Sequence, residues 1–233
     1  MDEIWVSHLG VVPYDDALAL QQRLRAARQA DLVPDILLLL QHPPVYTRGR
    51  RTAPGELPMG EDWYADRGID VIDTDRGGRV TYHGPGQLVG YPIMRITDVI
   101  VYLRTMEDAI IAALAEEGVP AGVHDGLTGV WVEDRKIASI GVHVSRGVTT
   151  HGFAVNVQND LRPFDWVVAC GIQGVQMTSV ERETHLRTLP CFRRRMAHQF
   201  AFAHQARQRL VSRARLESLL SPAPAGHVSG GAA

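Results

Sequence analysis

The stretch Arg76-Gly-Gly-Arg-Val-Thr-Tyr-His-Gly-Pro-Gly-Gln87 carries four glycines, one proline and one histidine between two apolar runs, residues 69–72 and 87–94. Glycines at this density indicate a backbone that adopts positive φ angles or approaches another group closely. A glycine-rich hairpin corner is the simplest explanation. A phosphate-binding loop is disfavoured, because Pro85 lacks the N–H that a phosphate would need, Gly90 comes one residue too late for a dinucleotide fingerprint, and no Walker lysine follows. We interpret the stretch as one wall of a binding site for an uncharged, elongated ligand.

Hydrophobic periodicity on both sides of this stretch predicts a mixture of strands and helices. Strands are expected at residues 4–9, 35–40, 69–73, 129–132, 137–144 and 149–157, and helices at residues 14–30, 61–67, 99–117 and 190–210. Residues 48–60 are expected to form a long loop of the kind that often covers a binding site. Since the strands occur in runs, the pattern predicts an α+β fold, a mixed β-sheet with flanking helices. A single domain is expected over residues 1–215, followed by a disordered tail over residues 216–233 that is rich in Pro, Gly and Ala from Ser221 onward.

The charge of the chain is nearly balanced, at −2 over 233 residues, but arginines gather locally, as at residues 48–51 and 193–195. Such a patch suits an acidic protein partner, whereas nucleic acid is disfavoured at a pI near 6.5. The N-terminus shows no signal-peptide pattern, and the apolar run at residues 36–40 is too short to span a bilayer. A location in the cytoplasm, with no membrane partner and no structural disulfide, is therefore expected.

Lys136 is the single lysine among 24 basic residues, the other 23 being arginine. Arginine does not release its proton in a protein, whereas lysine does when its surroundings favour the neutral form. Survival by chance on a turn is the alternative. A strand period places Lys136 on the same face as Ala138, Ile140 and Val142, and desolvation on an apolar face would make it a candidate general base.

Two cysteines compete for the role of nucleophile. Cys170 follows an apolar run and precedes Gly171, whose N–H could face an oxyanion. Cys191 stands at a predicted helix start beside three arginines. Both settings favour a thiolate, so the residues alone do not decide between them, and an inert buried thiol is the alternative for either.

The histidines do not have the spacing of metal ligands, so no metal site is expected. His83 alone is placed at the site, because it belongs to the glycine-rich stretch. The other histidines of the predicted domain are interpreted as hydrogen-bonded structural residues; they include His42, His124, His143 and His151.

Three motifs occur together: the stretch from Arg76 to Gln87, Lys136-Ile-Ala-Ser-Ile-Gly141 followed by His151-Gly-Phe-Ala-x-Asn156, and Cys170-Gly-Ile172. In this order they resemble the lipoyl(octanoyl) transferase family, from about residue 4 to the end of the last predicted helix. The resemblance implies the fold of biotin and lipoate protein ligases. It also implies a reaction in which an octanoyl group moves from acyl carrier protein to a specific lysine of a lipoyl domain.

The resemblance further implies roles for individual residues. Cys170 would be the acyl-thioester nucleophile and Lys136 its base, and Cys191 matches no family motif. The implied walls of the acyl tunnel are Arg76, Gly77, Gly78, Arg79, Val80, Thr81, Tyr82, His83, Ser139, Ile140, Gly141, Gly152, Phe153 and Ala154. No cofactor is implied.

The partners implied are octanoyl-acyl carrier protein as donor, and the lipoyl domains of 2-oxoacid dehydrogenase complexes and the glycine cleavage H protein as acceptors, with the enzyme a monomer. Three alternatives stay open. An ATP-dependent lipoate ligase of the same fold would adenylate a free acid; a non-catalytic module would only bind acyl carrier protein; a cysteine hydrolase would use water as acceptor.

Overall fold

The computed structural model describes residues 2–169 and 174–220. Its strands are β1 (Glu3–Val11), β2 (Asp35–Gln41), β3 (Val45–Arg48), β4 (Asp70–Asp73), β5 (Thr81–His83), β6 (Gln87–Ile93), β7 (Gly122–His124), β8 (Leu127–Val132), β9 (Arg135–Ser145), β10 (Val148–Asn156), β11 (Gln176–Met177) and β12 (Arg207–Leu210). Its helices are α1 (Tyr14–Gln29), α2 (Glu61–Ala65), α3 (Val99–Ala115), α4 (Val180–Thr184), α5 (Leu189–Ala203) and α6 (Arg213–Leu220), with a 3₁₀ turn at Arg162–Trp166.

The larger sheet has the strand order β12-β1-β2-β6-β10-β9-β8-β7, with β11 beside β9. β1 runs parallel to β2 and to β12, and β11 runs parallel to β9, whereas all other neighbouring strands of this sheet, from β2 through β6, β10, β9 and β8 to β7, are antiparallel. A smaller sheet has the order β4-β3-β5. The predicted mixed sheet with flanking helices is therefore confirmed.

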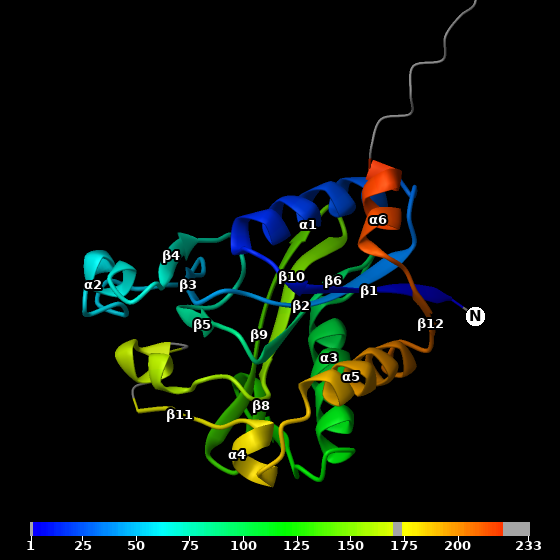
Figure 1. Cartoon of the computed structure of the whole chain (residues 1–233). Coiled ribbons are helices and arrows are strands. Elements are labelled where there is room, and N and C mark those ends of the chain that lie inside the picture. The colour runs from blue at the N-terminus through cyan, green and yellow to red at the C-terminus, as the bar shows by residue number, and fades with distance from the viewer. Residues whose placement is uncertain (1, 170–173, 221–233) are drawn as a thin grey trace, which may run out of the picture.

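The apolar run of β2 explains how the helices are arranged around the larger sheet. Ile36, Leu38 and Leu40 belong to the apolar cluster that contains residues of α1 and α6, and Leu37 and Leu39 belong to the cluster that contains residues of α3 and α5. A strand buried on both faces needs an apolar residue at every position. Figure 1 accordingly shows α1 and α6 above the sheet and α3 and α5 below it.

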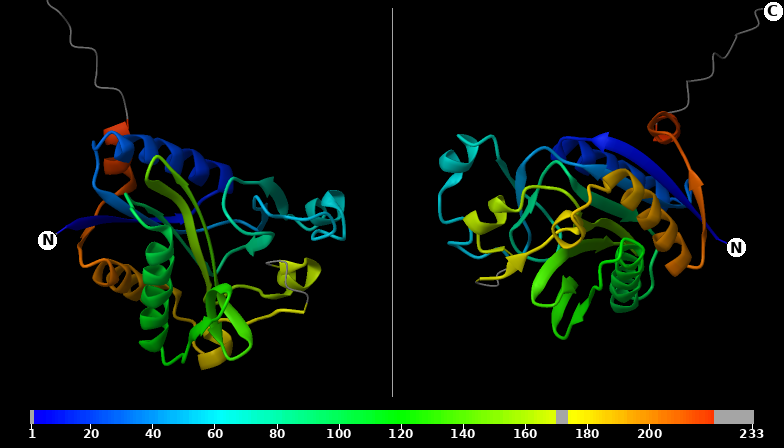
Figure 2. Two further views of the ribbon diagram at one scale, coloured as in Figure 1. Left: turned by 180° about the vertical axis from the view of Figure 1, so that it is seen from behind. Right: turned by 60° about the horizontal axis from the view of Figure 1, so that its bottom comes forward.

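The smaller sheet and α2 lie at one edge of the molecule, which is evident in both views of Figure 2. A third apolar cluster, which includes Tyr46, Tyr64, Tyr82 and Phe164, joins them to the 3₁₀ turn. The hydroxyl group of Tyr46 donates a hydrogen bond to the carbonyl oxygen of Pro163 at 2.6 Å. The glycine-rich stretch contains β5 of the smaller sheet and leads into β6 of the larger one, so it connects the two sheets.

The end of the chain differs from the prediction in two places. The helix expected over residues 190–210 ends at Ala203, because the chain turns at Gln205, which has a φ of 54°, and β12 then pairs with β1. The predicted start of the disordered tail, residue 216, is too early. Residues 216–220 belong to α6, and Leu216 is fully buried in the apolar cluster that contains residues of α1. Residues 221–233 lie outside the described part, and the single-domain expectation stays a prediction.

No helix in residues 2–169 or 174–220 combines the length and the apolar character needed to cross a bilayer.

Candidate active site

A cavity of about 300 Å³ lies where the glycine-rich stretch packs against the larger sheet. We call this cavity the slot. Tyr91 of β6, His151–Ala154 of β10, Ser139–Gly141 of β9 and Leu127–Thr128 of β8 line it, and these four strands are neighbours in that order. Its remaining lining residues are Tyr14, Arg51, Arg76, Gly78, Arg79, Thr81, His83, Gly126 and Lys136. The slot therefore runs across the strands rather than along one of them.

Small residues on β9 and β10 make room for the slot. Ser139 is paired with Ala154, and Gly141 with Gly152. A side chain at Gly141 would place its Cβ 2.8 Å from the carbonyl oxygen of Gly77, which belongs to the glycine-rich stretch. Glycine at this position lets that stretch lie close over the sheet.

Five of the eight residues predicted as walls in the glycine-rich stretch line the slot: Arg76, Gly78, Arg79, Thr81 and His83. Gly77, Val80 and Tyr82 do not. Val80 and Tyr82 belong to the third apolar cluster, because side chains alternate between the two faces of an extended segment. The predicted residues on β9 and β10, from Ser139 to Gly141 and from Gly152 to Ala154, all line the slot.

Arg76 is a buried cation that holds the stretch in place. Its Nη2 donates to the carbonyl oxygen of Thr47 at 2.6 Å, its Nε to Oγ1 of Thr47 at 3.1 Å, and its Nη1 to the carbonyl oxygen of Gly77 at 3.0 Å. The guanidinium thus ties the loop to β3 of the smaller sheet. Such fixed geometry uses the planar fork of arginine, which lysine lacks.

Lys136 lies at the β8 side of the slot and is only 4% exposed. Its Nζ donates to the carbonyl oxygen of Thr128 at 3.0 Å and lies 5.1 Å from the centre of the Trp131 ring. Lys136 is thus buried on β9 and does not lie on a turn, whereas its role as a base stays a prediction.

Cys170, the predicted nucleophile, lies outside the described residues. The chain before it is bound to the rim of the slot, because the N–H of Val168 donates to the carbonyl oxygen of Glu56 at 2.9 Å and the carboxylate of Glu56 is paired with Arg79. On the C-terminal side of residues 170–173, Met177 of β11 pairs with Lys136. Cys191 is exposed on α5 and does not line the slot.

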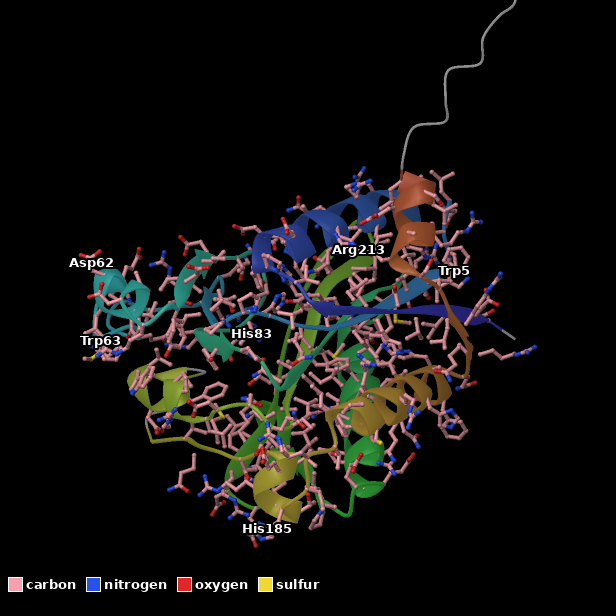
Figure 3. All side chains as sticks on the ribbon, in the orientation of Figure 1. Trp5, Asp62, Trp63, His83, His185 and Arg213 are labelled. Atoms are coloured by element: carbon pink, nitrogen blue, oxygen red, sulfur yellow. The ribbon has the colours of Figure 1, made fainter. Side chains whose placement is uncertain are left out.

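His83 lies where the smaller sheet meets the larger one, while Asp62 and Trp63 lie at the outer edge (Figure 3). Burial, and next the nearby His42, lower the pKa of His83 to about 3, so the ring is neutral. Its Nδ1 donates to Oε1 of Gln87 at 2.8 Å, since Nε2 of Gln87 donates to Asn156. This fixes the tautomer and leaves Nε2 of His83 as an acceptor.

Two further histidines hold tyrosine hydroxyls of the slot. Burial lowers the pKa of His42 to about 4; its Nδ1 donates to the carbonyl oxygen of Val12, so its Nε2 accepts from Tyr91, both at 2.7 Å. Burial also lowers the pKa of His151, whose Nε2 donates to Asp75 at 2.6 Å while its Nδ1 lies 3.4 Å from the hydroxyl of Tyr14. The sequence interpretation of His42 as structural holds, but His151 lines the slot.

The sequence interpretation missed seven residues of the slot. They are Tyr14, Arg51, Tyr91, Gly126, Leu127, Thr128 and His151. Two of them carried a signal: His151 opens the second part of the motif that begins at Lys136, and Arg51 belongs to the arginine patch at residues 48–51. Tyr14 and Tyr91 were hidden within a helix pattern and a strand pattern. The described residues contain no group of three His, Cys, Asp or Glu side chains placed to hold a metal ion.

Residues 13–201 match the model of the lipoyl protein ligase A/B catalytic domain. An octanoyltransferase of Mycobacterium leprae is 49% identical over 187 residues, which covers 76% of this chain and 77% of the relative. An octanoyltransferase of Corynebacterium efficiens is 46% identical over 192 residues, which covers 78% of this chain and 74% of the relative. The crystal structure of a lipoate-protein ligase A bound with ATP shares the fold, with a TM-score of 0.77 at 19% identity over 94% of this chain and 92% of that one. The chain belongs to the lipoyl protein ligase A/B catalytic-domain family.

Proposed function

We propose that this protein transfers an octanoyl group from octanoyl-acyl carrier protein to the ε-amine of a lysine on a lipoyl domain, through a thioester on Cys170. One observation carries the proposal: the single lysine of the chain is buried at one side of a slot whose floor is made of backbone and small side chains. Relatives that are 45–49% identical carry the name octanoyltransferase, which agrees with it.

In the first half-reaction Lys136 accepts the thiol proton of Cys170, and the thiolate attacks the carbonyl carbon of the octanoyl thioester. The C–S bond to the carrier breaks, and the carrier thiolate takes up the proton. In the second half-reaction the acceptor amine attacks the new thioester and gives a proton to Lys136. The C–S bond breaks as the amide forms, and the released thiolate of Cys170 takes up the proton from Lys136. General-base help of this kind is worth roughly a hundred- to ten-thousand-fold in rate.

The charges at the slot suit donors and acceptors carried on acidic domains. Its charged lining side chains are three arginines and Lys136, without a carboxylate among the described residues. Arg79 is paired with Glu56, whereas Arg51 is exposed at the rim. Complementary charge of this kind mainly accelerates encounter and orients the partner.

The test incubates the purified protein with octanoyl-acyl carrier protein and an unmodified lipoyl domain, and follows the mass of the lipoyl domain. One octanoyl group should appear on its target lysine without ATP, and a lipoyl domain with that lysine changed to arginine should gain none. A second arm supplies free octanoate with ATP and magnesium. If the lipoyl domain is modified in that arm alone, the protein is an ATP-dependent ligase and not a transferase. Release of free octanoate without modification of the lipoyl domain would favour a hydrolase.

A further inference from the structure

The side of the slot opposite Lys136 is closed by two tyrosines that belong to none of the three sequence motifs. Tyr91 of β6 and Tyr14, the first residue of α1, both line the slot and are each 4% exposed. Lys136 bonds to Thr128 of β8, and β9 and β10 lie between β8 and β6. Three steps between neighbouring strands, each of about 4.8 Å, place the two sides of the slot about 14 Å apart.

The two tyrosines form a fixed wall rather than an adaptable one. The Tyr14 ring lies 5.1 Å from that of His42 and 6.1 Å from that of His83, and the Tyr91 ring lies 6.4 Å from that of His151, measured between centroids. Each hydroxyl is also bound to one of these histidines, Tyr91 to His42 and Tyr14 to His151. Moving either ring outward would break a buried hydrogen bond as well as ring contacts.

The same hydrogen bonds make the wall compatible with an apolar ligand. Both hydroxyl protons are donated to histidine nitrogens within the protein. A methyl group that rests on the two rings therefore leaves no tyrosine donor without a partner. The polar atoms at this side of the slot do not require a polar ligand there.

The width of the slot matches a medium-length acyl chain. With C–C bonds of about 1.5 Å, an extended eight-carbon acyl chain is about 9 Å long. The slot is about 14 Å wide, so a chain of this length leaves about 5 Å at the Lys136 side for the thioester and the groups that attack it. The geometry points to Tyr14 and Tyr91 as the residues that contact the terminal methyl group and set the upper limit on acyl chain length, an inference that rests on the proposed transfer reaction.

The test measures kcat/KM for octanoyl, decanoyl and dodecanoyl groups on the same carrier protein. Tyr14→Ala and Tyr91→Ala should raise the decanoyl-to-octanoyl ratio at least about tenfold, the discrimination commonly produced by one or two methylenes in an apolar pocket. If either alanine variant unfolds, Tyr14→Leu serves as a milder substitution that still enlarges the slot. Tyr102→Ala is the matched control, because Tyr102 is a buried tyrosine of α3 that does not line the slot. The ratio within each variant does not depend on how much of the sample is folded.

An unchanged ratio in folded Tyr14 and Tyr91 variants, or an equal change in Tyr102→Ala, would overturn the inference while leaving the transfer reaction intact. A second readout does not need turnover: the rise in Tm caused by free octanoate, decanoate and dodecanoate. The longer acids should stabilise the two opening variants more than octanoate does, and the wild type should show the reverse order. If the wild type failed to transfer octanoyl yet gave this pattern, the proposed reaction would fall and the role of the tyrosines would stand.

Discussion

At the scale of single residues, Lys136 has the surroundings that a base at this slot would need. It is buried, its Nζ has a backbone carbonyl oxygen at 3.0 Å, and Met177, which follows the 170–173 segment, pairs with it. The strand pattern predicted its apolar surroundings from alternate positions on one strand. β9 pairs with β8 from Arg135 to Ala138, with a register shift between Val130 and Trp131, and with β10 from Ala138 to Ser145.

Lys136→Arg keeps the positive charge but cannot accept a proton. We expect Cys170 in this variant to keep part of its reactivity toward iodoacetamide, while transfer to the acceptor lysine falls roughly a hundred- to ten-thousand-fold. Lys136→Met, which fills similar space without charge, should lose both. Alkylation followed by mass spectrometry and a single-turnover transfer assay measure the two properties. Transfer at the wild-type rate in Lys136→Arg would rule out the dyad.

The buried histidines of the slot make stability depend on pH. Burial lowers the pKa of His42 to about 4 and that of His83 to about 3, whereas the ordinary pKa of histidine is 6.5. Below pH 6.5 the unfolded chain takes up protons that the folded protein does not, so stability falls as the pH falls toward these values. Each of the two histidines should cost about 2 kcal/mol between pH 6.5 and pH 5.

His42→Gln removes one of these groups, and its loss of stability between pH 6.5 and pH 5 should be smaller than that of the wild type by about 2 kcal/mol. Urea unfolding at the two pH values measures the difference. The variant should be less stable at both values, because glutamine does not reproduce both hydrogen bonds of the His42 ring, but only the difference between the two pH values tests the prediction. The same pH dependence in variant and wild type would show that His42 is not buried in its neutral form.

At the scale of elements, β8 and α3 keep Lys136 in its place. Gly129 of β8 has a φ of +125°, and its N–H donates to the buried carboxylate of Glu107 on α3 at 2.9 Å. A Cβ at this position would lie 2.7 Å from Cε of Lys136 and 2.6 Å from the carbonyl oxygen of Ala138. Glycine at position 129 therefore leaves room for the side chain of Lys136 to pack against β8.

Gly129→Ala should therefore displace the lysine and lower the rate of transfer by at least about tenfold, if the base works within hydrogen-bond reach as proposed. Gly118→Ala is the control, because Gly118 also has a positive φ, +79°, but a Cβ added there would meet nothing within 4 Å. Both variants carry backbone strain of about 1–3 kcal/mol. Equal rates per folded molecule in the two variants would contradict the positioning role of Gly129.

The elements that escaped prediction were short or determined by distant contacts. β12 has only four residues, all exposed, and its partner β1 lies at the other end of the chain. Tyr14 and Tyr91 have the patterns of a helix start and of a buried strand, and only the packing of α1 on β6 and β10 reveals them as one wall. Long apolar segments such as β2 and α3 carry their own signal, and these were predicted to within a few residues.

At the scale of the whole molecule, the last described elements, β12 and α6, pack against the first ones, β1 and α1. β12 extends the sheet next to β1, and α6 places Leu216 in the cluster beneath α1. The slot lies on the face covered by α1, whose first residue, Tyr14, forms part of its wall. β12 and α6 therefore support α1, the helix that closes one side of the slot.

Leu216→Ala should lower the free energy of unfolding by about 2–5 kcal/mol, because the side chain is fully buried. Leu210→Ala is the matched control: Leu210 is 66% exposed on β12, and its loss should change stability by no more than about 0.5 kcal/mol. Urea unfolding of both variants checks the difference. Equal stability would mean that α6 does not pack on α1 in solution.

The acyl-enzyme itself tests the central claim most directly. The protein is incubated with octanoyl-acyl carrier protein without acceptor, digested, and analysed by peptide mass spectrometry; a lipoyl domain is then added to a second sample. We expect one octanoyl group on the peptide that contains Cys170, its loss when the lipoyl domain gains the group, no adduct in Cys170→Ala, and a normal adduct in Cys191→Ala. An octanoyl group on Cys191, or undiminished transfer by Cys170→Ala, would contradict the account.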